Sequence, residues 1–216
     1  MSEPGSVLFA RSPIRPAEPV TVVAGWQVSG NRATSPLTIT DLAPLAKAVV
    51  RARWDGAAAG ALGVPHGRAA RNGTGALVTG SGPGEWLVLA PPGTTPEVAA
   101  ALPEAAADAE LVTALDLTHG LAVMRITGER SADLLAKVCA VDFSDRVTPD
   151  GSALRSSVAR LPAGVVRDDH DGESAPAGRS YLLHCDRSYG EYLFGALVDA
   201  GREFGIEVDG FRLPGI

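Results

Sequence analysis

The sequence predicts an α+β fold built from two similar split-βαβ-like halves, with helices packed on mostly antiparallel sheets. From Asp41 onward, the order strand, helix, strand, strand, helix occurs twice. Of the 216 residues, 45% are hydrophobic, which is enough apolar surface for a sizeable core. We therefore divide the chain into an extended N-terminal arm over residues 1–40, a first half over 41–110 and a second half over 111–216.

The arm is rich in Pro, Ser, Thr and Ala and contains only short apolar alternations, such as "VTVVAGW" at 20–26. A segment of this composition buries too little apolar surface to form a core of its own. We expect it to lie extended on the rest of the protein.

The first half contains four segments with local structural signals. A strand, a small-residue helix, a Gly/Pro-turned hairpin and a second helix are predicted at 48–55, 56–64, 75–91 and 94–109. Thr95 is the expected N-cap of the last helix, because Pro96 follows at its first helical position.

The second half repeats this order. The strand "LAVMRIT" at 121–127 precedes the helix "SADLLAKVC" at 131–139, for which Ser131 is a plausible cap. The segment "SSVARLPAGVVRDD" at 156–169 and the strand "YLLHC" at 181–185 follow.

The last helix is predicted over 188–204 as one amphipathic segment that Gly205 ends. Charged residues form its other, solvated side, so we assign this helix to structure and assembly and not to chemistry. The side chains expected to be buried are those of Tyr189, Tyr192, Leu193, Leu197 and Phe204.

Charge and hydropathy exclude two classes of partner. The net charge is −6, and the 19 basic residues are scattered, so the chain lacks the basic footprint that nucleic-acid binding requires. No window approaches the length of a membrane span, and the N-terminus lacks the apolar region of a signal peptide. We expect a cytoplasmic protein that contacts neither nucleic acid nor membrane.

The cysteines and histidines do not predict a metal site. Cys139 and Cys185 each lie among apolar residues, which is typical of buried free thiols. The four histidines are far apart, and the sequence contains neither CxxC nor HxxxH, so we expect no metal ligands.

Three motifs and one isolated histidine contain residue types that could support chemistry. The Gly-rich run at 73–86 lacks both GxGxxG spacing and a Walker lysine, which favours a hairpin over a nucleotide site. In "LDLTHG", Asp116, Thr118 and His119 could act as acid and base, but a turn before strand 121–127 is the preferred interpretation. His184 alternates with Leu183 and Cys185 on a strand, so it faces the other side of the sheet, and we favour a packed residue over a catalyst.

The third motif is "VVRDDHDGE", in which Asp168, Asp169, Asp171 and Glu173 surround His170. Carboxylates at this density could bind a hard cation, but EF-hand spacing is absent. A solvated loop is the preferred interpretation.

The order and spacing of several segments resemble the gamma-subunit family of heterotetrameric sarcosine oxidases, which are relatives of the aminomethyltransferases (glycine cleavage T-proteins). The resemblance covers about residues 38–211. It rests on "DLTHG" followed by a strand, on "GERSADLLAKVCAVD", on "CDRSYGEYLFGALVDAGREFGIEV" and, more weakly, on "EWLVLAP".

The resemblance implies a non-catalytic subunit of a complex that oxidatively demethylates sarcosine or a related secondary amine to glycine, with hydrogen peroxide and methylene-tetrahydrofolate as products. In that family, an alpha subunit holds NAD and tetrahydrofolate, a beta subunit holds FAD and FMN, and a small delta subunit holds zinc. It therefore implies alpha, beta and delta subunits as partners, and no catalytic, cofactor-binding or metal residue in this chain.

The aminomethyltransferase relatives place an acid beside folate within a Gly-Gly-x-x-Asp-Asp-like motif. "AGVVRDD" lies at the same point, so Asp168 or Asp169 would be the counterpart, although Ala163 replaces the first glycine and Arg167 precedes the acids. Those enzymes surround folate with several domains, and we expect most of these walls to be missing here. We therefore interpret the two acids as relics of a folate site.

Two alternatives remain open. One is a stand-alone folate-binding or one-carbon transfer protein that uses Asp168 or Asp169. The other is an unrelated interaction module with the same fold.

Overall fold

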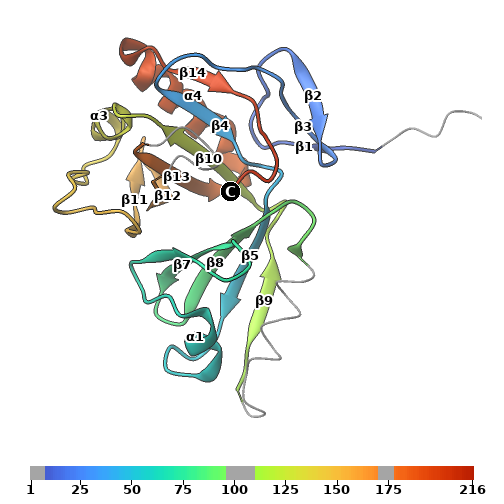
Figure 1. Ribbon diagram of the computed structural model, residues 1–216, viewed down its shortest axis with the longest axis vertical. Coiled ribbons are helices and arrows are strands. Elements are labelled where there is room, and N and C mark those ends of the chain that lie inside the picture. The colour runs from blue at the N-terminus through green and yellow to red at the C-terminus, as the bar shows by residue number, and fades with distance from the viewer. Residues whose placement is uncertain (1–7, 96–109, 170–177) are drawn as a thin grey trace, which may run out of the picture.

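Two large sheets organise the chain in a computed structural model, which describes residues 8–95, 110–169 and 178–216. They lie toward opposite ends of the long axis (Figure 1). The pairing is antiparallel except between β1 and β3 and between β4 and β14. The predicted α+β class with mostly antiparallel sheets is confirmed.

The first sheet has five strands in the order β6-β7-β8-β5-β9. The helix α1 (Ala57–Leu62) lies beside it at the lower end of Figure 1. The strands are β5 (Ala46–Arg51), β6 (Ala69–Arg71), β7 (Leu77–Gly82), β8 (Glu85–Ala90) and β9 (Thr113–Asp116).

The second sheet has six strands in the order β11-β12-β13-β10-β4-β14, and α3 (Ser131–Val138) and α4 (Gly190–Gly201) pack on one of its faces. The strands are β4 (Thr38–Asp41), β10 (Leu121–Thr127), β11 (Ala153–Val158), β12 (Leu161–Arg167), β13 (Ser180–Asp186) and β14 (Glu207–Asp209).

The N-terminal segment forms a small third sheet in the order β1-β3-β2. Its strands are β1 (Ala10–Arg11), β2 (Val20–Val23) and β3 (Trp26–Ser29). Trp26 and Val28 of β3 are buried in the core that also contains residues of both large sheets. The segment therefore packs on the body of the protein through β3.

Alternation along the strands creates three core layers. On β13, Tyr181 and Leu183 belong to the core under α3 and α4, whereas Leu182 belongs to the core between the two large sheets. On β8, Leu87 faces the core between the sheets and Trp86 belongs to a third core on the outer face of the five-stranded sheet. The order of layers is helices, six-stranded sheet, five-stranded sheet and outer core.

The hairpin predicted at 75–91 is confirmed as β7 and β8. Gly84 in its turn has φ +70°, and a Cβ there would lie 2.4 Å from the carbonyl oxygen of Ala52. Any larger residue would therefore force the turn away from the neighbouring chain. The strand predicted at 48–55 is present as β5, but it ends at Arg51 because the chain turns before Trp54.

The prediction of a single helix over 188–204 is wrong in its details. A 3₁₀ turn (Arg187–Tyr189) precedes α4 and another (Arg202–Phe204) follows it, and Gly205 ends the segment with φ +71° as predicted. Leu193 and Leu197 are buried, whereas Tyr189 and Tyr192 are 41% and 57% exposed. The buried stripe of α4 consists of Gly190, Leu193, Leu197, Ala200 and Gly201, so Tyr192 lies beside this stripe, and Tyr189 belongs to the 3₁₀ turn before the helix. Phe204 is half-buried.

Ser131 does not cap α3. Arg130 occupies the N-cap position without a side-chain cap bond, and the buried Ser131 hydroxyl has no hydrogen-bond partner among the described residues. The backbone N–H of Ser131 donates to the Gly128 carbonyl, which places Ser131 inside the first turn. The predicted helix at 94–109, including Pro96, falls largely outside the described residues.

The division at residues 40 and 110 stays a prediction. In the structure, β4 at 38–41 belongs to the six-stranded sheet and β9 at 113–116 to the five-stranded sheet. Within the described ranges, no helix is long and apolar enough to cross a membrane.

Candidate functional site

Asp168, one of the two predicted relic acids, lies at the end of β12 between two arginines. Arg125 of β10 donates from Nη2 to Oδ2 of Asp168 at 2.7 Å, and Arg71 of β6 donates to the same oxygen at 2.8 Å. The side chain of Arg125 is only 6% exposed and that of Asp168 11%. This cluster therefore joins the two large sheets through a buried charge.

Asp169 belongs to a second network. It accepts two charge-assisted hydrogen bonds from Nε and Nη2 of Arg167 and one from the backbone N–H of Ser180. Arg167 also donates to Asp145. The same carboxylate accepts a hydrogen bond from Arg179, the residue before β13. The hydrogen bonds that Arg167 donates to Asp169 and Asp145 raise the pKa of Arg167 above its ordinary value.

These contacts test whether the acids fit a folate. A carboxylate that polarises a pterin must have its charge available to the pterin, but both acids are already neutralised by guanidinium groups. The two side chains therefore do not fit that task, and we derive no step through folate. The other residues of the motif, His170, Asp171 and Glu173, lie outside the described residues.

A buried charged pair at the sheet junction escaped sequence analysis. Asp41 at the end of β4 accepts hydrogen bonds from the Ser12 hydroxyl and, at 2.8 Å, from the backbone N–H of Ala43. Lys47 of β5 is fully buried, and its ammonium donates to the carbonyls of Ala43, Leu45 and Thr118 at 2.7–3.1 Å. The Nζ atom also lies 5.6 Å from the centre of the Trp26 ring.

Burial shifts both groups toward neutrality. Desolvation raises the pKa of Asp41 to about 6, against the stabilising effect of Ser12 and Lys47. Desolvation also lowers the pKa of Lys47 to about 8, against its attraction to Asp41. Perturbed pKa values of this kind often mark active sites. Here all three ammonium hydrogens have backbone acceptors and Lys47 has no exposed surface, so the pair fixes the junction of the sheets and has no access to a substrate.

The "LDLTHG" segment forms the predicted turn. Gly120 and Leu121 donate from their backbone N–H groups to the Leu117 carbonyl, and the chain enters β10 at once. Asp116 accepts the backbone N–H of Thr118, and the ring of His119 stacks on Trp26 at 4.6 Å. Asp116 and His119 therefore contact different partners. The turn links β3, β5 and β10.

His184 faces away from Leu183 and Cys185, as predicted. Its ring lies against Gly164 of β12, where a Cβ would fall 1.9 Å from Nε2. Burial lowers the pKa of this imidazole to about 4, and the nearby Arg155 acts in the same direction. The histidine is neutral at physiological pH and fills space that the glycine leaves.

Both cysteines are free and buried, as predicted, and burial raises the pKa of Cys185 to about 11. A thiol in this state is unreactive. The described residues contain no group of three or more His, Cys, Asp or Glu side chains that could hold a metal ion.

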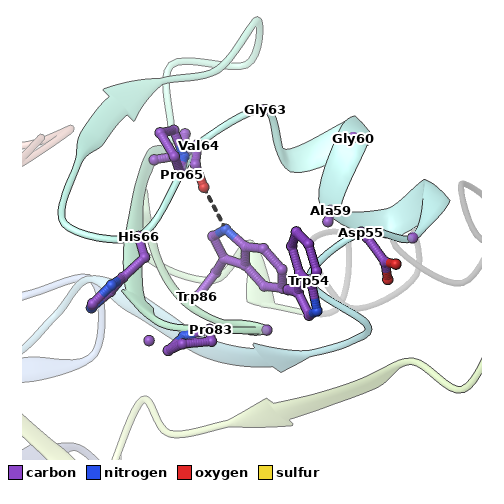
Figure 2. Close-up of a pocket in the computed structure, with 13 residues that line it drawn as sticks. Trp54, Asp55, Ala59, Gly60, Gly63, Val64, Pro65, His66, Pro83 and Trp86 are labelled. Atoms are coloured by element: carbon purple, nitrogen blue, oxygen red, sulfur yellow. Dashed lines mark hydrogen bonds between the residues drawn. The ribbon is translucent and has the colours of Figure 1, made fainter.

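A cavity of about 620 Å³ lies on the five-stranded sheet, between α1 and the β7–β8 turn. Figure 2 shows Trp54 and Trp86 in its centre, with Pro65 and Pro83 on one side. The indole N–H of Trp86 donates to the Val64 carbonyl at 2.7 Å, whereas Trp54 is 72% exposed. Asp55 and His66 also line this cavity, but most of its lining residues are aromatic, aliphatic, proline or glycine, which fits a largely apolar group.

The family assignment rests on sequence. The family described as GCVT N-terminal domain matches residues 70–212, which is more than half of the chain. The chain belongs to the GCVT N-terminal domain family. This match contains the Arg71–Asp168–Arg125 cluster and the helices α3 and α4, so the predicted relationship to aminomethyltransferases is confirmed.

Two solved structures place this GCVT-domain protein among its relatives. A chain of the heterotetrameric sarcosine oxidase from Corynebacterium sp. U-96, in complex with pyrrole 2-carboxylate, has 25% identity and a TM-score of 0.65 over 78% of this chain and 85% of that chain. Glycine cleavage system aminomethyltransferase T from Bartonella henselae has 13% identity and a TM-score of 0.64 over 88% of this chain. The match covers 55% of the aminomethyltransferase chain, and it shows the fold alone. A comparison with curated proteins found no match.

Proposed function

We propose that the protein is a non-catalytic gamma-type subunit of a heterotetrameric sarcosine oxidase-like complex in the cytoplasm. Such a complex oxidatively demethylates sarcosine or a related secondary amine to glycine and yields hydrogen peroxide and methylene-tetrahydrofolate. The observation that carries the proposal is the 25% identity to one chain of a heterotetrameric sarcosine oxidase, over most of both chains. The match has nearly the same coverage in both directions, as expected for chains of similar length with the same role.

The state of the titratable groups supports a structural role. Asp168 and Asp169 are occupied by arginines, and Lys47 is sealed by three carbonyl acceptors. Catalysis requires a base within reach of a proton on a substrate. We therefore assign the amine oxidation, with NAD, FAD, FMN, tetrahydrofolate and zinc, to partner subunits of the alpha, beta and delta types.

Exposed apolar side chains support an assembled state. Several large ones protrude from the described surface, namely those of Leu8, Trp54, Leu111, Leu115 and Tyr192. A tryptophan with 72% of its surface exposed beside a cavity is typical of a contact that a partner completes.

Purification from the native host tests the proposal. A tagged chain should co-purify with larger subunits in fixed ratio, and the complex should absorb at flavin wavelengths and oxidise sarcosine. The isolated chain should be colourless. A yellow isolated chain, or one recovered alone at every step, would contradict the subunit role.

The alternative is a stand-alone folate-binding protein, favoured by the position of Asp168 and Asp169 in the GCVT-type domain. Titration of the isolated chain with tetrahydrofolate distinguishes the two. Saturable binding that is lost in Asp169→Asn, with the melting temperature unchanged, would favour the alternative.

A further inference from the structure

A second cavity, of about 460 Å³, lies between β4, β10 and the segments 33–36 and 209–216. We call it the C-terminal cavity. Its floor is the face of the six-stranded sheet opposite Ile39 and Ile126, and its walls are the two segments that fold back across β4. This volume is in the range of sites for small molecules.

The walls are fixed by specific contacts. The backbone N–H of Gly210 donates to the Asn31 carbonyl at 2.9 Å, and Phe211 is 2% exposed in the core between the sheets. A Cβ at Gly210 would fall 2.4 Å from the Ser29 carbonyl oxygen, so the close approach of the two segments requires glycine. The cavity is therefore preformed in the folded chain.

The floor is a row of hydroxyl groups beside a guanidinium. Thr40 pairs with Arg125, and Thr38 pairs with Thr127, so these four side chains share one face of β4 and β10. Among the described residues, the Thr38 and Thr40 hydroxyls have no hydrogen-bond partner. Neither hydroxyl oxygen is fully buried. They are therefore open to the cavity.

Arg125 contributes donors that its protein partners do not use. Nη1 donates to the Asp168 carbonyl and the Ser180 hydroxyl, and Nη2 donates once, to Asp168 Oδ2. A guanidinium has five N–H groups. Within the described ranges, Nε and the second hydrogen of Nη2 have no acceptor. The Nε atom is not fully buried, so a ligand can reach it.

The Arg71–Asp168–Arg125 cluster, of which only Arg125 lines the cavity, has one net positive charge. Asp168 is the one carboxylate among the described residues that pairs with Arg125, and it is shared with Arg71. Asp209 at the rim is paired with Arg212. Asp168 is the counterion of Arg125, and the excess positive charge belongs to the three-residue cluster as a whole, so this charge attracts an anion at the free edge of Arg125.

We propose that the C-terminal cavity binds a small organic carboxylate. Its two oxygens accept hydrogen bonds from Arg125 and the floor threonines, and its apolar body lies against Leu213, Pro214 and Ile216. A planar fork of donors matches a carboxylate, and the apolar walls select an organic acid over an inorganic anion. This binding is independent of the proposed subunit role, and Asp168 takes part only by holding Arg125 in place.

The test uses the full chain, 3-phenylpropionate as the probe, and NMR of labelled threonine and isoleucine methyl groups. We expect saturable shifts at Thr38, Thr40, Thr127 and Ile216 with a Kd of about 1 mM or tighter. The uncharged 3-phenylpropanol and inorganic phosphate should each bind at least about tenfold weaker. The alcohol lacks the carboxylate, and phosphate lacks the apolar body.

Two pairs of variants localise the site. Leu213→Glu places a negative charge at the rim and should weaken the probe at least about fivefold, whereas Leu111→Glu, at an exposed leucine just before β9 of the other sheet, should not. Thr40→Val removes one floor hydroxyl and should weaken the probe about threefold or more, whereas Thr113→Val should not.

The proposal is overturned if the probe gives no saturable shift up to about 20 mM, far above the expected Kd. It is also overturned if 3-phenylpropanol binds as tightly as the acid, or if Leu111→Glu weakens the probe as much as Leu213→Glu. Loss of the proposed subunit role would leave all of these results unchanged.

Discussion

Arg125 on β10 donates to Asp168 at the end of β12 across 2.7 Å, and the Arg125 side chain is buried while that of Asp168 is 11% exposed. The same acid also binds Arg71 from the other large sheet. An acid that resembles a folate ligand in sequence therefore acts in this chain as the bridge between the sheets. Removal of this carboxylate should therefore lower the free energy of unfolding.

We predict that Asp168→Asn lowers the free energy of unfolding by about 3 kcal/mol, because it leaves the buried Arg125 guanidinium without its counterion. Asp55→Asn is the matched control, since Asp55 pairs with Arg53 at the exposed surface. Urea titration of both variants is the measurement. Equal midpoints for the two variants would show that the bridge is not stabilising.

His184 should make the protein sensitive to acid. Its pKa is lowered from 6.5 to about 4 in the folded state, so the unfolded chain takes up the proton first as the pH falls. The contribution is fully present above pH 6.5 and is lost toward pH 4. Relative to the parent, His184→Gln should lose about 2 kcal/mol less stability between pH 7 and pH 4. Parallel profiles of parent and variant in that range would refute this prediction.

Asp41 should act in the opposite direction over nearly the same range. Its pKa is raised from 3.8 to about 6, so the folded chain takes up the proton first, and this contribution is lost as the pH rises through 6. Asp41→Asn lacks that gain and should lose about 2–3 kcal/mol more stability than the parent when the pH falls from 7 to 4. The readout is chemical denaturation at several pH values, with Asp209→Asn as a partly exposed control.

Trp54 tests the expected subunit contact. Trp54→Ala should leave the melting temperature of the isolated chain nearly unchanged, because the side chain is 72% exposed. In the native host, the variant should recover at least about tenfold less of the partner subunits if the tryptophan is an interface anchor. Leu115→Ala on the edge strand β9 is the comparison variant, because Leu115 is also exposed but has a smaller side chain than Trp54. Undiminished recovery with Trp54→Ala would place the interface elsewhere.

Local signals were sufficient for most of the fold. The hairpin with Gly84, the strand 121–127 and the turn at His119 follow from alternation and turn chemistry, and the structure contains all three. The extent of the buried face of the last helix was beyond such signals. Tyr189 fits the apolar periodicity, but the chain enters α4 through a 3₁₀ turn that periodicity does not reveal.

The charged groups of the site could not be placed from sequence because their partners are distant in the chain. Lys47 stands in an apolar strand, which is the one signal that it is buried, yet its acceptors include Thr118 and its countercharge is Asp41. Likewise, the positions of Arg71 and Arg125 give no indication that both contact Asp168. Long-range ion pairs depend on the packing of the two sheets, which only the structure shows.

The helix α4 provides a last test, of whether the C-terminal stretch is structural. Leu197 lies on the buried face of α4, in one core with Leu134, Leu193 and residues of the second sheet, so Leu197→Asp would bury a charge without a partner. We expect it to cost several kcal/mol, a large share of the roughly 5–15 kcal/mol that stabilises a domain. Glu191→Gln lies on the exposed side of the same helix and should cost about 0.5 kcal/mol or less. Thermal melts compare the two variants, and co-purification of partner subunits is a second readout. If Leu197→Asp melted like the parent while Glu191→Gln abolished oxidation in a fully assembled complex, α4 would carry chemistry, contrary to the structural role that its buried stripe indicates.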